Sequence, residues 1–142
     1  DNIRILAASA VEKAKSCHPG GAMGGADFIN VLYSEYLKYD PKNPEWVGRD
    51  RFFLDPGHMA PMLYSQLTLI GKFSLDELSQ LRQWGSPTTG HPEFEVARGI
   101  ENTSGPLGQG HTQATQPSRK RPSTPTSLMV AYKKRFRKAA HA

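Results

Sequence analysis

The sequence contains a single cysteine, Cys17, among 142 residues. One cysteine excludes a disulfide within the chain and favours a reducing compartment. No stretch approaches the roughly 20 consecutive apolar residues of a membrane-spanning helix. Asp1 also opens the chain without the charged and then apolar pattern of a secretory signal. These absences predict a soluble, cytoplasmic protein that does not bind a membrane.

Acidic residues are absent from residues 113–142, which hold eight Lys or Arg, whereas the preceding residues hold ten bases and thirteen acids. The tail therefore carries +8 and the body −3. Such a tail could bind nucleic acid or another anionic surface non-specifically. We prefer a disordered, solvated tail without a nucleic-acid partner, because prolines interrupt it and Tyr132 and Phe136 are its only aromatic residues.

Apolar periodicity predicts several helices. Residues 3–14 place apolar side chains on one face, and the Cys-His-Pro-Gly-Gly turn at 17–21 should end that helix. A second helix is expected after Gly24-Gly25, with Asp27 at its start, ending before Asp40-Pro41. Residues 62–70 should form a third helix.

Residues 74–77, Ser-Leu-Asp-Glu, have the pattern of a capping box, which predicts a helix start. We expect Leu75, Leu78 and Leu81 to point inward from this helix. The short aromatic run at 51–54, followed by Asp-Pro-Gly, predicts a buried strand that enters a turn. Residues 85–110 contain six glycines and three prolines and should be mostly loop.

Three histidines, His18, His58 and His91, lie beside Gly or Pro at sharp turns, in "CHPGG", "DPGHM" and "TGHPE". Each alone is compatible with an ordinary surface turn, but three in one small body favour a shared cleft. Imidazole suits proton transfer near neutral pH. Zinc binding is the alternative. We disfavour it, and predict no metal ligands here, because the histidines are widely spaced and only one cysteine accompanies them.

The loop Gly105-Pro106-Leu107-Gly108-Gln109-Gly110 is rich in glycine. It lacks the Lys-Ser/Thr pair of a phosphate-binding P-loop and the G-x-G-x-x-G order of dinucleotide folds. Without Cβ atoms at three positions, its backbone can approach a flat ring closely. The pattern indicates a small-molecule site, although a tight turn without a ligand remains the alternative.

Five motifs in order, "IRILAASAVEKAKS", "SCHPGG", "RDRFFLDPGH", "GHPE" and "GIENTSGPLGQG", resemble the N-terminal part of transketolase over residues 1 to about 112. The resemblance implies an α/β thiamine-diphosphate-binding fold with helices packed on a mostly parallel sheet. It also implies a homodimer or a companion subunit, thiamine diphosphate with Mg²⁺, and transfer of a two-carbon ketol unit between sugar phosphates.

Site roles follow from the same resemblance. His18 would lie beside the thiazolium and the donor sugar, His58 would face the cofactor near its reactive carbon, and His91 would hydrogen-bond the donor. Backbone groups of Gly105, Pro106 and Leu107 would meet the aminopyrimidine. The sequence departs from the family where Cys17 replaces a common serine and where Asp-Pro at 55–56 replaces Ser-Asn.

The family's magnesium motif, Asp-Gly with a later Asn, and the glutamate of its second domain are not found in this sequence. We therefore expect residues 1–112 to be the N-terminal part of the domain, residues 113–142 to be a non-homologous tail, and the isolated chain to be inactive. A non-catalytic partner of a complete subunit is the alternative. Codons from Leu128 onward, read one base earlier, allow Asp-Gly-Gly, so we hypothesise that the reading frame shifts after Thr112.

Overall fold

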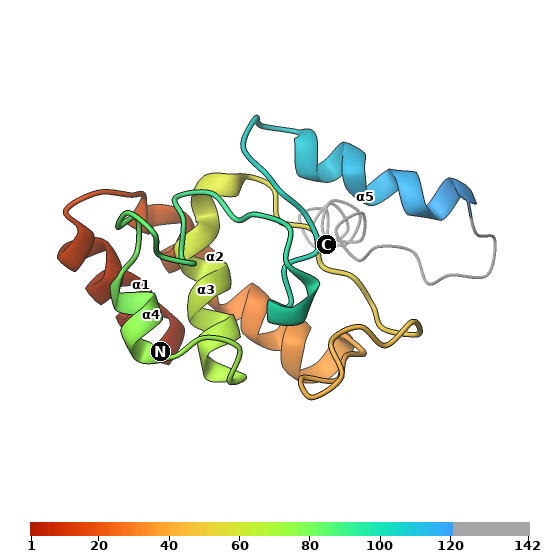
Figure 1. Ribbon diagram of the computed structural model, residues 1–142, viewed down its shortest axis with the longest axis horizontal. Coiled ribbons are helices and arrows are strands. Elements are labelled where there is room, and N and C mark those ends of the chain that lie inside the picture. The colour runs from red at the N-terminus through yellow and green to blue at the C-terminus, as the bar shows by residue number, and fades with distance from the viewer. Residues whose placement is uncertain (121–142) are drawn as a thin grey trace, which may run out of the picture.

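The structure, a computed structural model, describes residues 1–120 of the chain. Within that range the elements are helical (Figure 1). The α-helices are α1 (Asn2–Ala14), α2 (Pro19–Val31), α3 (Ala60–Leu69), α4 (Leu75–Ser79) and α5 (Gln109–Lys120). A π-helical turn η1 (Leu32–Tyr36) extends α2, and two 3₁₀ turns, η2 (Gly57–Met59) and η3 (Val96–Arg98), lie in the loops.

Helix α3 lies at the centre of the body. All residues from Ala60 to Leu67 are buried, so this helix has no solvent-exposed face in its first two turns. Helices α1, α2 and α4 pack around it (Figure 1). A helix that is covered on all sides makes a rigid base for the loops that leave its N-terminal end, and His58 lies in the turn directly before it.

The predicted first helix is confirmed. Helix α1 buries Ile3, Ala7 and Ala10, which follow the expected helical spacing. It ends at Ala14, and the C-cap residue Lys15 adopts a left-handed conformation with φ 49°.

The second helix begins earlier than expected. Pro19 is its first residue and His18 its N-cap, so the predicted start near Asp27 is wrong. Proline suits the first helical position because its φ is already helical. An N–H group at that position would have no intrahelical acceptor, so its absence costs nothing. The buried face is Ala22, Ala26 and Ile29, and burial of this face outweighs the low helix propensity of the glycines between them.

The strand predicted at residues 51–54 does not form, and the described residues contain no strand, only an isolated bridge between Glu95 and Ile100. Phe52, Phe53 and Leu54 are nonetheless buried. A strand requires a neighbouring strand to pair with its backbone. Here the side-chain amide of Asn102 bonds to the backbone of Leu54 instead. The sheet of the predicted α/β fold is therefore not confirmed.

The capping box at Ser74 is confirmed, with Glu77 as its partner. Leu78 and Leu81 are buried as predicted, whereas Leu75 is 64% exposed. Phe73, two residues before Leu75, is buried instead, and Leu75, the first residue of α4, faces solvent. Residues 85–108 form mostly loop, as expected, with the single 3₁₀ turn η3.

Helix α5 crosses the expected domain boundary at residues 112 and 113. Gln113 accepts a hydrogen bond from Asn102, and Ala114 is completely buried. The first residues of the predicted tail therefore pack on the body. The boundary itself stays a prediction, and the basic residues 133–138 and the Asp-Gly-Gly frame region lie outside the described residues.

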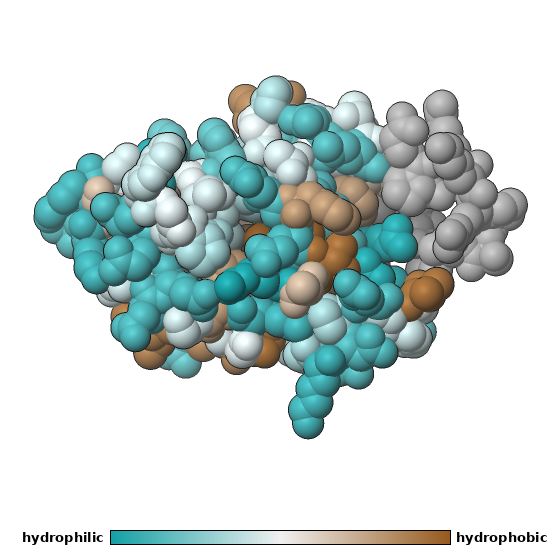
Figure 2. All heavy atoms as spheres, in the orientation of Figure 1, coloured by the Kyte–Doolittle hydropathy of each residue, from teal (hydrophilic) through white to brown (hydrophobic). Residues whose placement is uncertain are grey.

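The face drawn in Figure 2 is mostly hydrophilic, with hydrophobic residues in scattered patches. Among the described residues, Trp84 is fully exposed, and Leu107 and Phe94 are 76% and 62% exposed. No helix in this part of the chain has the length and apolar character required to cross a membrane.

Candidate functional site

The turn at residues 55–58 is the centre of the candidate site. His58 lies in η2, immediately before α3, and His18 caps the N-terminus of α2. Their rings meet edge to face, with centroids 5.1 Å apart and planes at 68°. Two histidines from different turns are therefore brought together by the packing of α2 on α3.

His91 approaches the same turn from the long loop. A Cβ placed on Gly57 would lie 3.0 Å from Cδ2 of His91 and 2.8 Å from the carbonyl oxygen of Ser104. Only glycine allows these two segments to come so close. The segments of all three predicted histidines thus converge at Gly57, with His58 half-buried and both His18 and His91 exposed.

Asp55 fixes the glycine loop to this turn. Its carboxylate accepts hydrogen bonds from the backbone N–H of Gly108, at 3.2 Å, and of His111, at 3.3 Å. These N–H groups belong to the start of α5, whose first turn has no intrahelical acceptors for them. A negative charge at a helix N-terminus is also favourable to the helix dipole. Asp55 therefore holds the loop and the helix together.

The side chain of Asn102 links two further segments of the same region. Its side-chain amide exchanges two hydrogen bonds with the backbone of Leu54, at 3.0 and 3.2 Å, and donates a third to Gln113. The side chain is buried, so these bonds form away from water, where leaving them unmade would be costly. Asn102 thereby joins the predicted strand segment to α5.

Tyr64 and Thr89 support the backbone of His91. The Thr89 hydroxyl donates to the His91 carbonyl at 2.5 Å and lies 3.1 Å from the Tyr64 hydroxyl. Because a threonine hydroxyl has one proton, Tyr64 must be the donor to Thr89. Burial raises the pKa of Tyr64 to about 12, which keeps this donor protonated at neutral pH.

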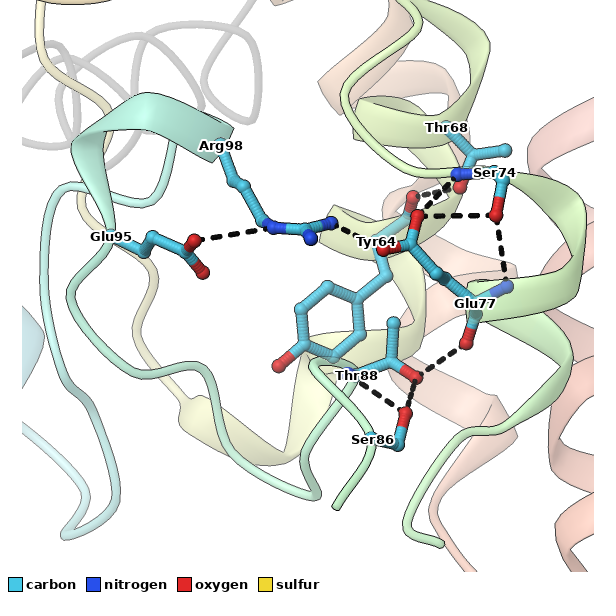
Figure 3. Close-up of polar contacts among 8 residues, drawn as sticks. All are labelled: Tyr64, Thr68, Ser74, Glu77, Ser86, Thr88, Glu95 and Arg98. Atoms are coloured by element: carbon cyan, nitrogen blue, oxygen red, sulfur yellow. Dashed lines mark hydrogen bonds and ion pairs between the residues drawn. The ribbon is translucent and has the colours of Figure 1, made fainter.

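A second polar network fixes the ends of the long loop (Figure 3). Glu77 accepts from Arg98 at 2.8 Å, and its backbone carbonyl accepts from the buried hydroxyl of Thr88 at 2.7 Å. Arg98 also pairs with Glu95 and lies 4.8 Å over the Phe73 ring. The network ties the residues that flank His91 on both sides to helix α4.

Asp55, Asn102, Tyr64 and Thr89 were not predicted as site residues. Asp55 could have been suspected, because it stands where the sequence departs from the family pattern. The other three give no local signal. Of the predicted cofactor contacts, Gly105 is half-buried, while Pro106 and Leu107 are exposed. The roles assigned to these three residues and to the histidines remain predictions.

The arrangement fits the ring portion of thiamine diphosphate. A Cβ on Gly105 would contact nothing within 4 Å, so the loop backbone is open there. The neighbouring Ser104 hydroxyl is buried without a hydrogen-bond partner. The exposed His91 imidazole lies close to Ser104, since a Cβ on Gly57 would meet both. Within residues 1–120, no group of three His, Cys, Asp or Glu side chains is arranged to hold a metal ion.

The fold matches a known class, the thiamine-diphosphate-binding domains. The family model described as "Transketolase, thiamine diphosphate binding domain" matches residues 1–126. The chain belongs to this transketolase family.

Similar proteins support the assignment. Transketolase-1, chloroplastic, of Arabidopsis thaliana is 54% identical over 116 residues, which are 80% of this chain and 16% of the relative. Transketolase of Geobacillus stearothermophilus is 50% identical over 113 residues, 79% of this chain and 17% of the relative. The chain thus spans about a sixth of the length of these relatives.

Solved structures agree. Transketolase from Leishmania mexicana has a TM-score of 0.76 and 47% identity over 79% of this chain and 17% of that one. A Pichia stipitis transketolase in complex with sedoheptulose-7-phosphate has a TM-score of 0.76 and 42% identity, over 80% of this chain and 17% of that one. The described helical body is therefore that of the N-terminal part of a transketolase.

Proposed function

We propose that this chain supplies the histidines and the glycine loop of a transketolase site. The reaction is transfer of a two-carbon ketol unit between sugar phosphates with thiamine diphosphate and Mg²⁺, in a homodimer or with a companion subunit. The observation that carries the proposal is the convergence of the segments of His18, His58 and His91 at Gly57, next to the loop that Asp55 anchors. The sugar phosphate in the Pichia stipitis structure supports this substrate class.

The three histidines differ in solvent exposure, and we assign their roles accordingly. His18 and His91 are exposed and can exchange protons with sugar hydroxyls, for which imidazole is suited near neutral pH. His58 is half-buried, and its ring meets that of His18 edge to face. We assign it the contact with the cofactor near the reactive carbon. Thr89 and Tyr64 hold the His91 backbone in place.

Gly105, Pro106 and Leu107 bind the aminopyrimidine through their backbone N–H and C=O groups. When bound, thiamine diphosphate supplies the electron sink for cleavage of a carbon–carbon bond next to a carbonyl.

The cytoplasmic location remains a prediction, and the Arabidopsis relative carries a chloroplast designation in its name.

The test is a chimera in which residues 1–112 of this chain replace the matching segment of Geobacillus stearothermophilus transketolase, which is 50% identical. We expect the chimera to transfer ketol units between sugar phosphates within about tenfold of the parent kcat. A chimera that folds and binds thiamine diphosphate but shows no turnover would contradict the proposal.

A further inference from the structure

Arg82 joins two loops that the proposed function does not connect. Its guanidinium donates from Nη1 to the Ser16 hydroxyl at 2.7 Å. A Cβ placed on Gly90 would lie 2.7 Å from Nε of the same side chain, so the guanidinium rests against the Gly90 backbone. Ser16 precedes the Cys17-His18 turn, and Gly90 directly precedes His91.

The turn before His18 needs an external restraint. Lys15 has φ 49° and Cys17 has φ 119°, both in the positive region that side chains with a Cβ rarely adopt. Such conformations persist only where the surrounding structure determines them. Ser16 lies between these two residues, and its hydroxyl is the group that Arg82 holds.

Arg82 is itself anchored on the body. Its backbone has φ 61°, and its N–H donates to the carbonyl of Thr88 at 2.9 Å. Thr88 is fully buried and bonded to α4 through Glu77. The exposed side chain of Arg82 therefore starts from a fixed point and ends on two separate loops.

We propose that Arg82 is a positioning residue that sets the His18 turn and the His91 loop relative to each other. Its planar guanidinium can donate in-plane to Ser16 while one face lies on Gly90, which a lysine ammonium cannot do. The catalytic meaning of this role rests on the proposed function, but the structural role does not.

The experiment measures backbone order and histidine side-chain resonances by NMR in the full 142-residue chain, without cofactor or sugar. In Arg82→Ala, we expect the amide order parameters at residues 16–18 and 90–91 to fall together, from about 0.85 to below about 0.6. The imidazole resonances of His18 and His91 should broaden in the same variant. Alanine keeps the Cβ, so the backbone preference at residue 82 changes little.

Two further variants separate the contacts. Unlike Arg82→Ala, Arg82→Lys should keep residues 16–18 ordered, because an ammonium still reaches Ser16. Residues 90–91 should lose order in both variants. Gly90→Ala keeps the arginine and displaces its guanidinium, so it should loosen the distant Ser16 turn. This second variant keeps the test decisive if Arg82→Ala fails to fold.

Lys13→Ala is the matched control, because Lys13 makes a comparable long-range hydrogen bond, from α1 to the Ser79 hydroxyl of α4 at 3.0 Å, without touching either histidine loop. It should leave both segments ordered. The proposal is overturned if Lys13→Ala loosens them equally, or if Arg82→Ala folds and leaves either segment unchanged. Because no ligand is present, this outcome is independent of the chimera's activity.

Discussion

Gly110 is the residue at which the glycine loop has least room. A Cβ there would overlap the carbonyl oxygen of Leu54 and lie 2.7 Å from Cβ of Asp55. Because the obstructing atoms include backbone, no side-chain rotation can relieve the contact. The glycine is therefore required by the approach of α5 to the predicted strand segment.

We predict that Gly110→Ala lowers the free energy of unfolding by about 1–3 kcal/mol, the usual cost of overpacking. The matched control is Gly24→Ala, where a new Cβ would contact nothing within 4 Å on the exposed side of α2. There alanine should stabilise by about 0.5–1 kcal/mol. Urea unfolding followed by circular dichroism measures both, and equal effects of the two substitutions would show that the loop is not packed as described.

At the scale of elements, helix α4 depends on Glu77. The backbone N–H of Ser74 and then the Arg98 guanidinium hold the pKa of Glu77 below its ordinary value of 4.5. A carboxyl whose pKa is lowered by folding stabilises the protein fully above that ordinary value. This stabilisation is lost as the pH falls through the lower, folded-state pKa.

We therefore predict that the Glu77→Gln variant loses less unfolding free energy than the native chain as the pH falls from about 5 to about 3. The slope of unfolding free energy against pH should become shallower in this range, while stability at pH 7 falls modestly because the residue is partly solvated. Thermal unfolding at several pH values measures the slope. An unchanged slope would mean that Glu77 is not held by Ser74 and Arg98.

The elements that the sequence predicted correctly have strong local signals. The apolar spacing of α1 and the Ser74 capping box both depend on residues three or four positions apart. The missed features depend on distant partners. The start of α2 depends on burial against α3, and Leu54 pairs with Asn102, 48 residues away. The convergence of the histidines at Gly57 likewise requires the tertiary fold, although their residue types and turns are evident in the sequence.

At the scale of the whole molecule, we predict that the isolated 142-residue chain does not bind thiamine diphosphate tightly or turn over sugar phosphates. It carries groups that suit the ring portion of the cofactor, and the family's magnesium motif and activating glutamate are not in its sequence. Calorimetry with thiamine diphosphate and Mg²⁺ measures this. A micromolar or tighter dissociation constant would show that residues 1–142 suffice.

The change of composition after Thr112 leads to another prediction. If a base was lost there, the degenerate code allows the codons of residues 128–140, read one base earlier, to encode Asp-Gly-Gly-Leu-Gln-Glu-Glu-Ile-Ser-Gln-Gly-Gly, which resembles the family's missing cofactor segment. Resequencing the region and weighing the intact protein test this. Stop codons or unrelated residues in the shifted frame would leave a genuine basic tail.

The most direct test of the account is the kcat of three histidine variants in the transketolase chimera. We predict that His18→Ala and His91→Ala each lower kcat at least about 100-fold, the usual minimum for a lost acid–base group. His58→Ala should also lower kcat, because it removes the proposed contact with the cofactor. His111→Ala is the control, since the side chain of His111 is exposed and its backbone N–H, which bonds to Asp55, is kept in alanine, and it should stay within about threefold. If all three variants retain kcat within a few-fold of the chimera, the histidines are turn residues and the proposed site is wrong.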